Sequence, residues 1–158
     1  MICATDIALQ FGAKRILHPL SISFQKAEFV AVIGPNGAGK SSLLHVLSGN
    51  QQPTAGTVCL DGKKMADWHV QTLAKRRAYL HQQHTVFGDF TVREILEMGR
   101  FSHATDLRNP EEYRLLQSVL NMLGMETRMH QNYQQLSGGE QQRVQFGRVL
   151  LQLHDLRN

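Results

Sequence analysis

The sequence lacks the features that mark secreted, membrane-spanning or metal-binding proteins. It has 158 residues and only two cysteines, Cys3 and Cys59, which form no metal-binding spacing with each other. No apolar run approaches the ~20 residues of a membrane span. Residues 1–6 lack the basic and apolar regions of a signal peptide. These absences favour a protein of a reducing compartment with two free, buried thiols.

Charge is also unremarkable, with 17 Lys and Arg against 13 Asp and Glu. The net charge of +4 is too small to identify an anionic partner. The one dense basic cluster, Lys75–Arg77, precedes an apolar segment and is interpreted as a solvated helix end, so no nucleic-acid partner is expected. A hydrophobic content of 42% is typical of one soluble globular domain.

The first half of the chain is rich in strand patterns separated by turn signals. Short strands are expected around residues 3–9, 21–24, 57–60 and 78–80, with a helix over residues 70–77. Phe29–Ile33 is a continuous apolar run, which predicts a buried parallel strand.

The second half is dominated by helix signals. Thr91 and Glu94 form a capping box, and Asn109 followed by Pro110 is a strong helix start. Gly124 predicts the end of that second helix. The order of strands and helices predicts an α/β fold: a nucleotide-binding core, with a mixed sheet and flanking helices, that carries a helical subdomain.

The most informative segment follows the apolar run at residues 29–33. It reads Gly34-Pro35-Asn36-Gly37-Ala38-Gly39-Lys40-Ser41, a complete G-x-x-x-x-G-K-[ST] phosphate loop. The glycines let successive backbone N–H groups turn toward an anion, Lys40 adds a positive charge, and Ser41 offers a hydroxyl to Mg²⁺. A helix over residues 42–47 would present its N-terminus to the phosphates.

A second segment, residues 136–143, has the chemistry of another anion-binding helix start. Ser137 and Glu140 form a capping box, and Gly138 and Gly139 let a ligand approach the backbone. Taken alone, the segment is better interpreted as a plain helix cap, because capping boxes are common.

Together, the two segments resemble the phosphate loop and signature motif of the ATP-binding-cassette (ABC) family, over nearly the whole chain. The resemblance implies that Phe11 stacks on adenine and that Gln82 lies in the glutamine loop. It implies that Lys40 and Gln82 act in catalysis, and that Ser41 and Gln82 hold Mg²⁺. The residues implied to bind ATP are Phe11, Gly34, Pro35, Asn36, Gly37, Ala38, Gly39, Lys40, Ser41, Ser42, Ser137, Gly138, Gly139 and Glu140.

A narrower resemblance concerns the cargo. Residues 90–100 resemble the segment after the glutamine loop in importers of iron chelates, vitamin B12 and haem, and residues 140–150 are most similar to haem (hemin) importer ATP-binding subunits. This implies a peripheral protein at the cytoplasmic face of the inner membrane. Its implied partners are a second copy, permease subunits and, indirectly, a periplasmic substrate-binding protein. The histidines are interpreted as surface residues, because the family's cargo passes through the permease.

The resemblance also exposes what the 158 residues do not contain. In the family, the signature helix is followed by a strand ending in aspartate, then a glutamate that activates water and a later histidine; none is found in this sequence. We therefore expect an incomplete nucleotide-binding domain over residues 1–158, with a β-rich core (1–82), a helical subdomain (83–140) and a signature helix (137–153). Nucleotide binding without efficient hydrolysis is expected.

Two alternatives stay open at this point. One is a non-catalytic nucleotide-binding fragment or docking module. The other is a chromosome-maintenance or DNA-repair ATPase, but such proteins carry a long coiled coil between the two motifs, and no heptad run separates them here.

Overall fold

The computed structural model describes residues 1–81, 86–103 and 109–154. The chain divides into two compact units, residues 1–69 and residues 70–158. Among the helices in the described ranges, none combines the length and apolarity needed to cross a bilayer.

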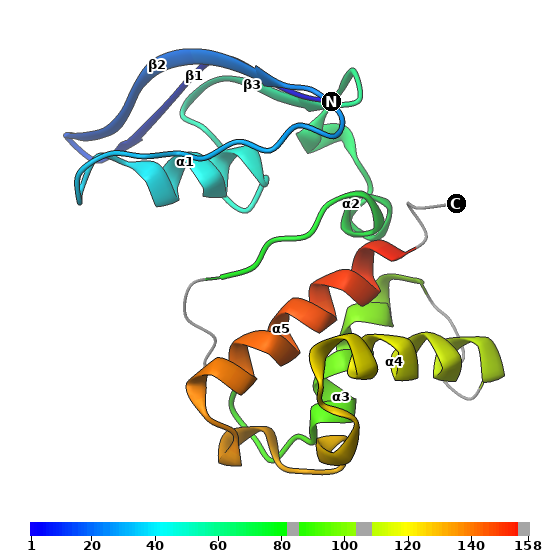
Figure 1. Ribbon diagram of the computed structural model, residues 1–158. Coiled ribbons are helices and arrows are strands. Elements are labelled where there is room, and N and C mark those ends of the chain that lie inside the picture. Colours follow the sequence, from blue (N-terminus) through cyan, green and yellow to red (C-terminus); the bar gives the residue numbers. More distant parts are fainter. Residues whose placement is uncertain (82–85, 104–108, 155–158) are drawn as a thin grey trace. The chain divides into compact units, whose positions relative to one another are not determined.

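The first unit is built on a four-stranded sheet in the order β2-β1-β3-β4. Its strands are β1 (Ile2–Phe11), β2 (Lys14–Phe24), β3 (Ala55–Leu60) and β4 (Lys63–Lys64), and every described pairing is antiparallel. Helix α1 (Lys40–Leu47) lies against one face of this sheet (Figure 1). Its buried Val46 and Leu47 contribute to a small core with Ile7 and Leu9 of β1.

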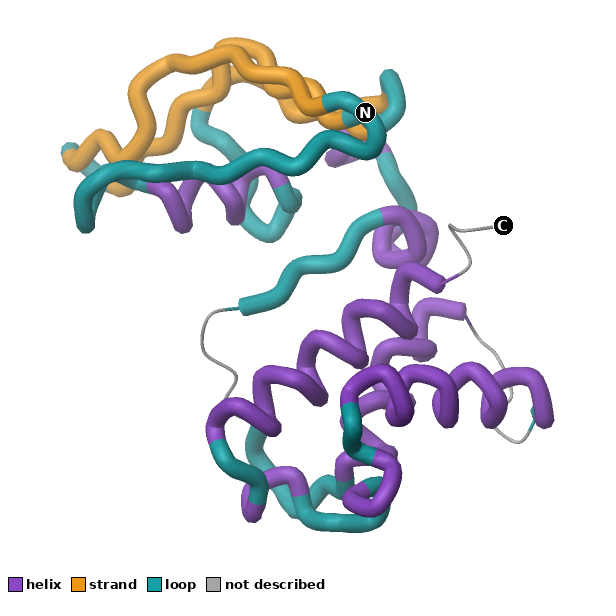
Figure 2. The backbone as a smooth tube through the Cα atoms, viewed as in Figure 1, coloured by secondary structure: helices purple, strands orange, loops and turns teal. Residues whose placement is uncertain are grey.

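Residues 25–39 connect the sheet to α1 without regular secondary structure (Figure 2). The predicted strand at Phe29–Ile33 is therefore wrong for this structure. No hydrogen bond among the described residues involves the backbone of residues 29–33, and the Phe29 and Ile33 side chains are 95% and 93% exposed. The physical reason is the lack of a neighbouring strand among the described residues, because a strand is stable only when its backbone groups are paired.

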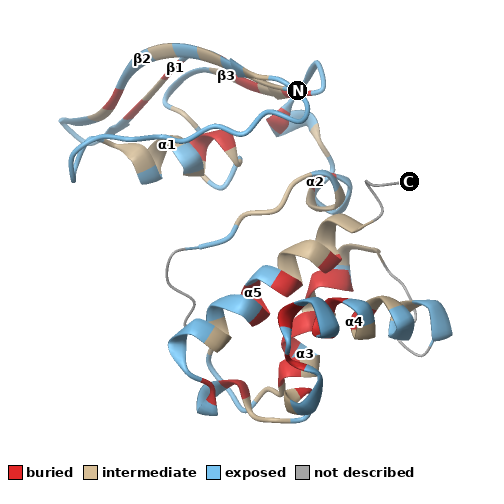
Figure 3. Ribbon diagram, viewed as in Figure 1, coloured by how far each residue is buried: buried red, intermediate tan, exposed pale blue. Residues whose placement is uncertain are grey.

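The second unit is helical. It contains α2 (Val70–Arg76), α3 (Val92–Glu97), α4 (Pro110–Leu123) and α5 (Gly138–Leu153), with 3-10 helices that include η2 (Met98–His103) and η4 (Tyr133–Gln135). The buried faces of α3, α4 and α5 enclose one apolar core (Figure 3). Gly147 makes the contact close, since a Cβ atom there would lie 2.6 Å from Leu123 Cδ1 and 2.8 Å from Leu96 Cδ2.

Local helix signals predicted from sequence are confirmed in this unit. Thr91 and Glu94 form a reciprocal capping box, Asn109 caps α4, and Gly124 ends α4 in the left-handed conformation. The predicted helix near residues 70–77 is present as α2. The predicted strand at Ala78–Leu80 is wrong, because these residues pair with no strand among those described.

Candidate functional site

The phosphate-loop sequence forms the turn that leads into α1. Gly37 and Gly39 both adopt left-handed backbone conformations, with φ of 83° and 86°. Gly39 is the N-cap residue, and a Cβ atom there would lie 2.9 Å from Ile16 O on β2. Glycine at 39 thus satisfies two demands at once, backbone conformation and close approach to the sheet.

The start of α1 has no side-chain cap and no acidic residue in its first turn. The first helical hydrogen bond runs from Leu43 N–H to Gly39 O, at 2.8 Å. The preceding N–H groups of the helix consequently have no carbonyl partner within it, and they lie at the positive end of the helix dipole. This arrangement suits an anion, and Ser41 is exposed at the same turn.

Lys40 provides the charge beside these amides. Its Nζ donates to Gly34 O at 2.8 Å and to Pro35 O at 2.7 Å, so the ammonium is folded over the phosphate loop. A phosphate oxygen is a better acceptor for an ammonium than a neutral carbonyl is. Lys40 is therefore placed to exchange loop carbonyls for an anion.

Phe11 ends β1 at the hairpin with β2, and its side chain is 55% exposed. Its ring is accessible for stacking, although no described residue stacks on it. Gln82, expected in the glutamine loop, lies outside the described residues.

The signature segment belongs to the second unit and starts α5. Ser137 is the N-cap residue; its Oγ accepts from Glu140 N–H and donates to Glu140 Oε2, which lies 2.7 Å away. Glu140 Oε2 also accepts from Ser137 N–H at 2.8 Å. Gly138 and Gly139 are exposed, with open space where a Cβ would be.

The capping box also sets the protonation of Glu140. Hydrogen bonds from the Ser137 side chain and backbone, with the nearby Arg128 and Arg143 charges, lower the pKa of Glu140 below its ordinary 4.5. Arg128 lies 3.2 Å from the Glu140 carboxylate. The carboxylate is thus charged at neutral pH and occupies the positive end of α5.

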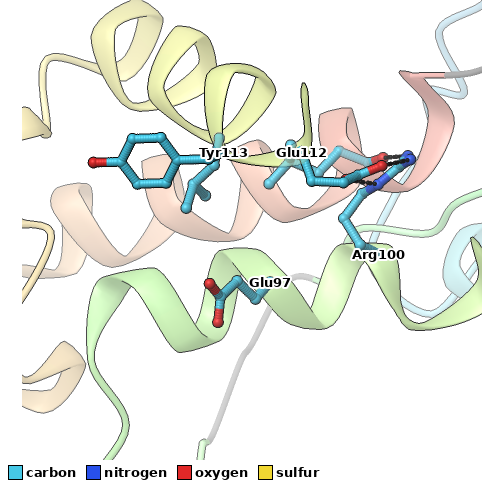
Figure 4. Close-up of a pocket in the computed structure, with 6 residues that line it drawn as sticks. Glu97, Arg100, Glu112 and Tyr113 are labelled. Carbon is cyan, nitrogen blue, oxygen red and sulfur yellow. Dashed lines mark hydrogen bonds and ion pairs between the residues drawn. The ribbon is translucent and has the colours of Figure 1, made fainter. Parts of the chain in front are cut away.

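Sequence reasoning missed a buried ion pair that anchors the other end of α5 (Figure 4). Arg100, 5% exposed, donates to both carboxylate oxygens of Glu112 at 2.8 Å and to Leu151 O at 2.9 Å. It joins η2, α4 and the last turn of α5 beside a small pocket. An Arg and a Glu twelve residues apart carry no local signal of this pairing.

Within the three described ranges, no group of three or more His, Cys, Asp or Glu side chains is arranged to hold a metal ion.

Comparison with known proteins assigns the family. The sequence profile of the ABC transporter family matches residues 17–156. The chain is 40% identical over 145 residues to the hemin import ATP-binding protein HmuV of Methylobacillus flagellatus, covering 92% of this chain and 54% of that protein. It is 44% identical over 138 residues to HmuV of Rhodopseudomonas palustris, covering 87% and 50%. The chain spans about half the length of the curated relatives it matches.

Solved structures agree with this assignment. The dimeric structure of MJ0796, a bacterial ABC transporter cassette, superposes with a TM-score of 0.83 at 28% identity, over 96% of this chain and 70% of that one. A post-hydrolysis MJ0796 dimer bound to ADP and Pi gives a TM-score of 0.82 at 26% identity, over the same shares. These neighbours confirm the predicted α/β class, and the relatives confirm the resemblance to the haem-importer class. The chain belongs to the ABC transporter family.

Proposed function

We propose that this chain is the ATP-binding part of an ABC importer subunit whose cargo is haem or a related iron chelate. The observation that carries the proposal is the start of α1, where uncapped amides, a left-handed Gly39 and the folded-back Lys40 lie together. The cargo class is supported by the relatives, which are hemin import ATP-binding proteins.

The proposed site is shared between two copies of the chain. The phosphate loop of one copy would hold the triphosphate, and Ser137, Gly138 and Gly139 of the other would contact its γ-phosphate. Two helix N-termini attract the same polyanion, so ATP would hold the copies together until phosphate is lost. In this scheme, Ser41 and Gln82 would hold Mg²⁺, which would neutralise charge on the phosphates.

The other proposed partners follow from an importer role. Permease subunits would bind near Gln82 and residues 87–100, at the cytoplasmic face of the inner membrane. A periplasmic substrate-binding protein would take part indirectly. Opening and closing of the ATP-bridged pair would move the permease.

For the 158-residue chain itself we propose nucleotide binding with little turnover. Its sequence contains no counterpart of the family's strand-end aspartate, its glutamate or its later histidine. The alternative function is a non-catalytic nucleotide-binding fragment or docking module, which would bind nucleotide without turnover. Binding and turnover must therefore be measured separately.

The test uses the full chain with a fluorescent ATP analogue for affinity and phosphate release for turnover. Lys40→Ala should weaken binding roughly a hundredfold, because a charged hydrogen-bond donor is lost. Lys26→Ala, which removes an exposed lysine of the same unit, is the matched control and should bind like the wild type. Equal affinities for the two variants would refute the phosphate site, and rapid phosphate release by the wild type would refute the proposed low turnover.

A further inference from the structure

A buried polar pair lies just behind the signature segment. Gln145 of α5 is 1% exposed and Tyr133 of η4 is 2% exposed. The Gln145 Nε2 donates to Tyr133 Oη at 3.1 Å, while Gln145 Oε1 accepts no hydrogen bond from any described residue. A buried amide with an unsatisfied oxygen is costly, so its presence in an otherwise apolar core calls for an explanation.

Tyr133 makes hydrogen bonds both to the segment before α3 and to α5. Its backbone N–H donates to Phe90 O at 2.8 Å, and its backbone O accepts from Gln141 Nε2 at 3.2 Å. The phenolic oxygen of Tyr133 accepts the hydrogen bond from Gln145 Nε2. Tyr133 therefore links the segment before α3 to two successive turns of α5.

The neighbours of Tyr133 strengthen the link to the segment before α3. Asn132 Nδ2 donates to Asp89 Oδ1 at 3.1 Å, and Gln134 Nε2 donates to Gly88 O at 3.1 Å. Val92 N–H donates to Gln131 O at 3.0 Å. Residues 131–134 are thus paired along residues 88–92, and Ser137 follows within one turn.

A hydrogen bond restricts the relative orientation of the two groups that it joins, whereas an apolar contact restricts it much less. The far end of α5 is held by Arg100, and its middle packs closely at Gly147. The first turns of α5, which carry Gly138 and Gly139, would still be able to rotate on an apolar surface. The Gln145–Tyr133 and Gln141–Tyr133 bonds oppose that rotation.

We propose that Tyr133 and Gln145 are positioning residues that hold the signature end of α5 in a set orientation relative to residues 88–92. The consequence for ATP rests on the proposed function, whereas the orientation itself does not. The pair sets the direction in which Ser137, Gly138 and Gly139 face a nucleotide. Its buried polar groups are retained for that orientation and add little to stability.

The decisive variant is Tyr133→Phe/Gln145→Leu in the full chain, because replacing both partners by apolar groups leaves no unpaired buried group. Helical unfolding, followed by circular dichroism in urea, should have a midpoint close to that of the wild type. Amide hydrogen exchange at residues 133–141 should become about tenfold faster, the size expected for one lost hydrogen bond. Gln142→Ala, an exposed glutamine of the same helix, is the control and should leave both measurements unchanged.

The proposal would be overturned if amide hydrogen exchange at residues 133–141 were as slow in the folded double variant as in the wild type. It would also be overturned if exchange in the double variant became faster evenly over α3, α4 and α5. If the double variant does not fold, Gln141→Ala removes only the hydrogen bond from Gln141 Nε2 to Tyr133 O. Amide exchange faster than in Gln142→Ala supports the proposal, and equal exchange overturns it.

Light scattering with ATP gives a separate result. Failure of the wild type to associate would count against the shared ATP site, and the exchange data would still decide the positioning role.

Discussion

Helices α1 and α5 begin with the same kind of glycine-rich segment, yet their first turns are completed differently. The N-cap residue of α1 is Gly39, which has no side chain, and no acid follows it. The N-cap residue of α5 is Ser137, whose partner Glu140 accepts hydrogen bonds from both the backbone and the hydroxyl of Ser137.

The difference separates two tasks of a helix N-terminus. An anion that reaches α1 meets unsatisfied amides and the Lys40 ammonium, with no carboxylate to compete. An anion that reaches α5 meets a turn that already holds a carboxylate, with Gly138 and Gly139 as the open approach. We therefore expect α1 to supply most of the phosphate affinity and α5 to keep its shape without a ligand.

The largest expected effect concerns the anchored end of α5. Arg100→Met leaves the Glu112 carboxylate, whose side chain is only 11% exposed, without its partner and should lower the free energy of unfolding of the helical unit by about 3 kcal/mol. Urea unfolding followed by far-ultraviolet circular dichroism measures this. Arg114→Met, an exposed arginine of α4, should change little, and equal curves for the two variants would contradict the anchoring role.

A smaller effect is expected at the uncapped start of α1. Gly39→Ala must adopt a left-handed conformation and bring its Cβ to 2.9 Å from Ile16 O, so we expect a loss of about 2 kcal/mol in the first unit. Gly37→Ala has the same conformational strain without that contact and should lose about half as much. The fluorescence of Trp68, the only tryptophan, follows this unit in urea. Identical losses would show that the approach to β2 is unimportant.

Removing the side-chain cap should make the start of α5 resemble that of α1. Ser137→Ala is expected to cost the helical unit about 1 kcal/mol, and Thr91→Ala, which breaks the equivalent box at α3, a similar amount. Only Ser137→Ala should also weaken ATP-dependent association. Weakened association in both variants would point to loss of stability as its cause.

The smallest effect is a dependence on pH. Because the folded pKa of Glu140 lies below its ordinary 4.5, its contribution to stability is complete above that value and is lost as pH falls through the lowered folded pKa. Glu140→Gln should flatten part of this decline in urea unfolding measured between neutral and acidic pH. The Thr91–Glu94 box retains its own acid dependence, since the pKa of Glu94 is also lowered by hydrogen bonds from Thr91. If stability declined with falling pH in Glu140→Gln as it does in the wild type, Glu140 would not contribute to the pH dependence.

Features that depend on neighbours in sequence were predictable. The boxes at Thr91 and Ser137, the cap at Asn109 and the terminating Gly124 each involve residues within one turn of a helix, so the sequence pattern specifies the contact. The phosphate-loop glycines were predictable for the same reason, since Gly37 and Gly39 adopt the backbone angles that only glycine tolerates well.

Features that depend on distant partners were not predictable. Phe29–Ile33 has the composition of a buried strand, but composition does not supply the adjacent strand that pairing requires. No sequence pattern indicated that Arg100 and Gln145 are buried, and their burial follows from where Glu112, Leu151 and Tyr133 lie after packing.

The sequence alone determined the family resemblance, the turn that can cradle a phosphate and the places where helices begin and end, because each rests on short-range backbone chemistry. Tertiary structure alone decided which strands pair and which polar side chains are buried in the helical unit. Those outcomes depend on desolvation and on hydrogen-bond partners that come together only when the chain has packed.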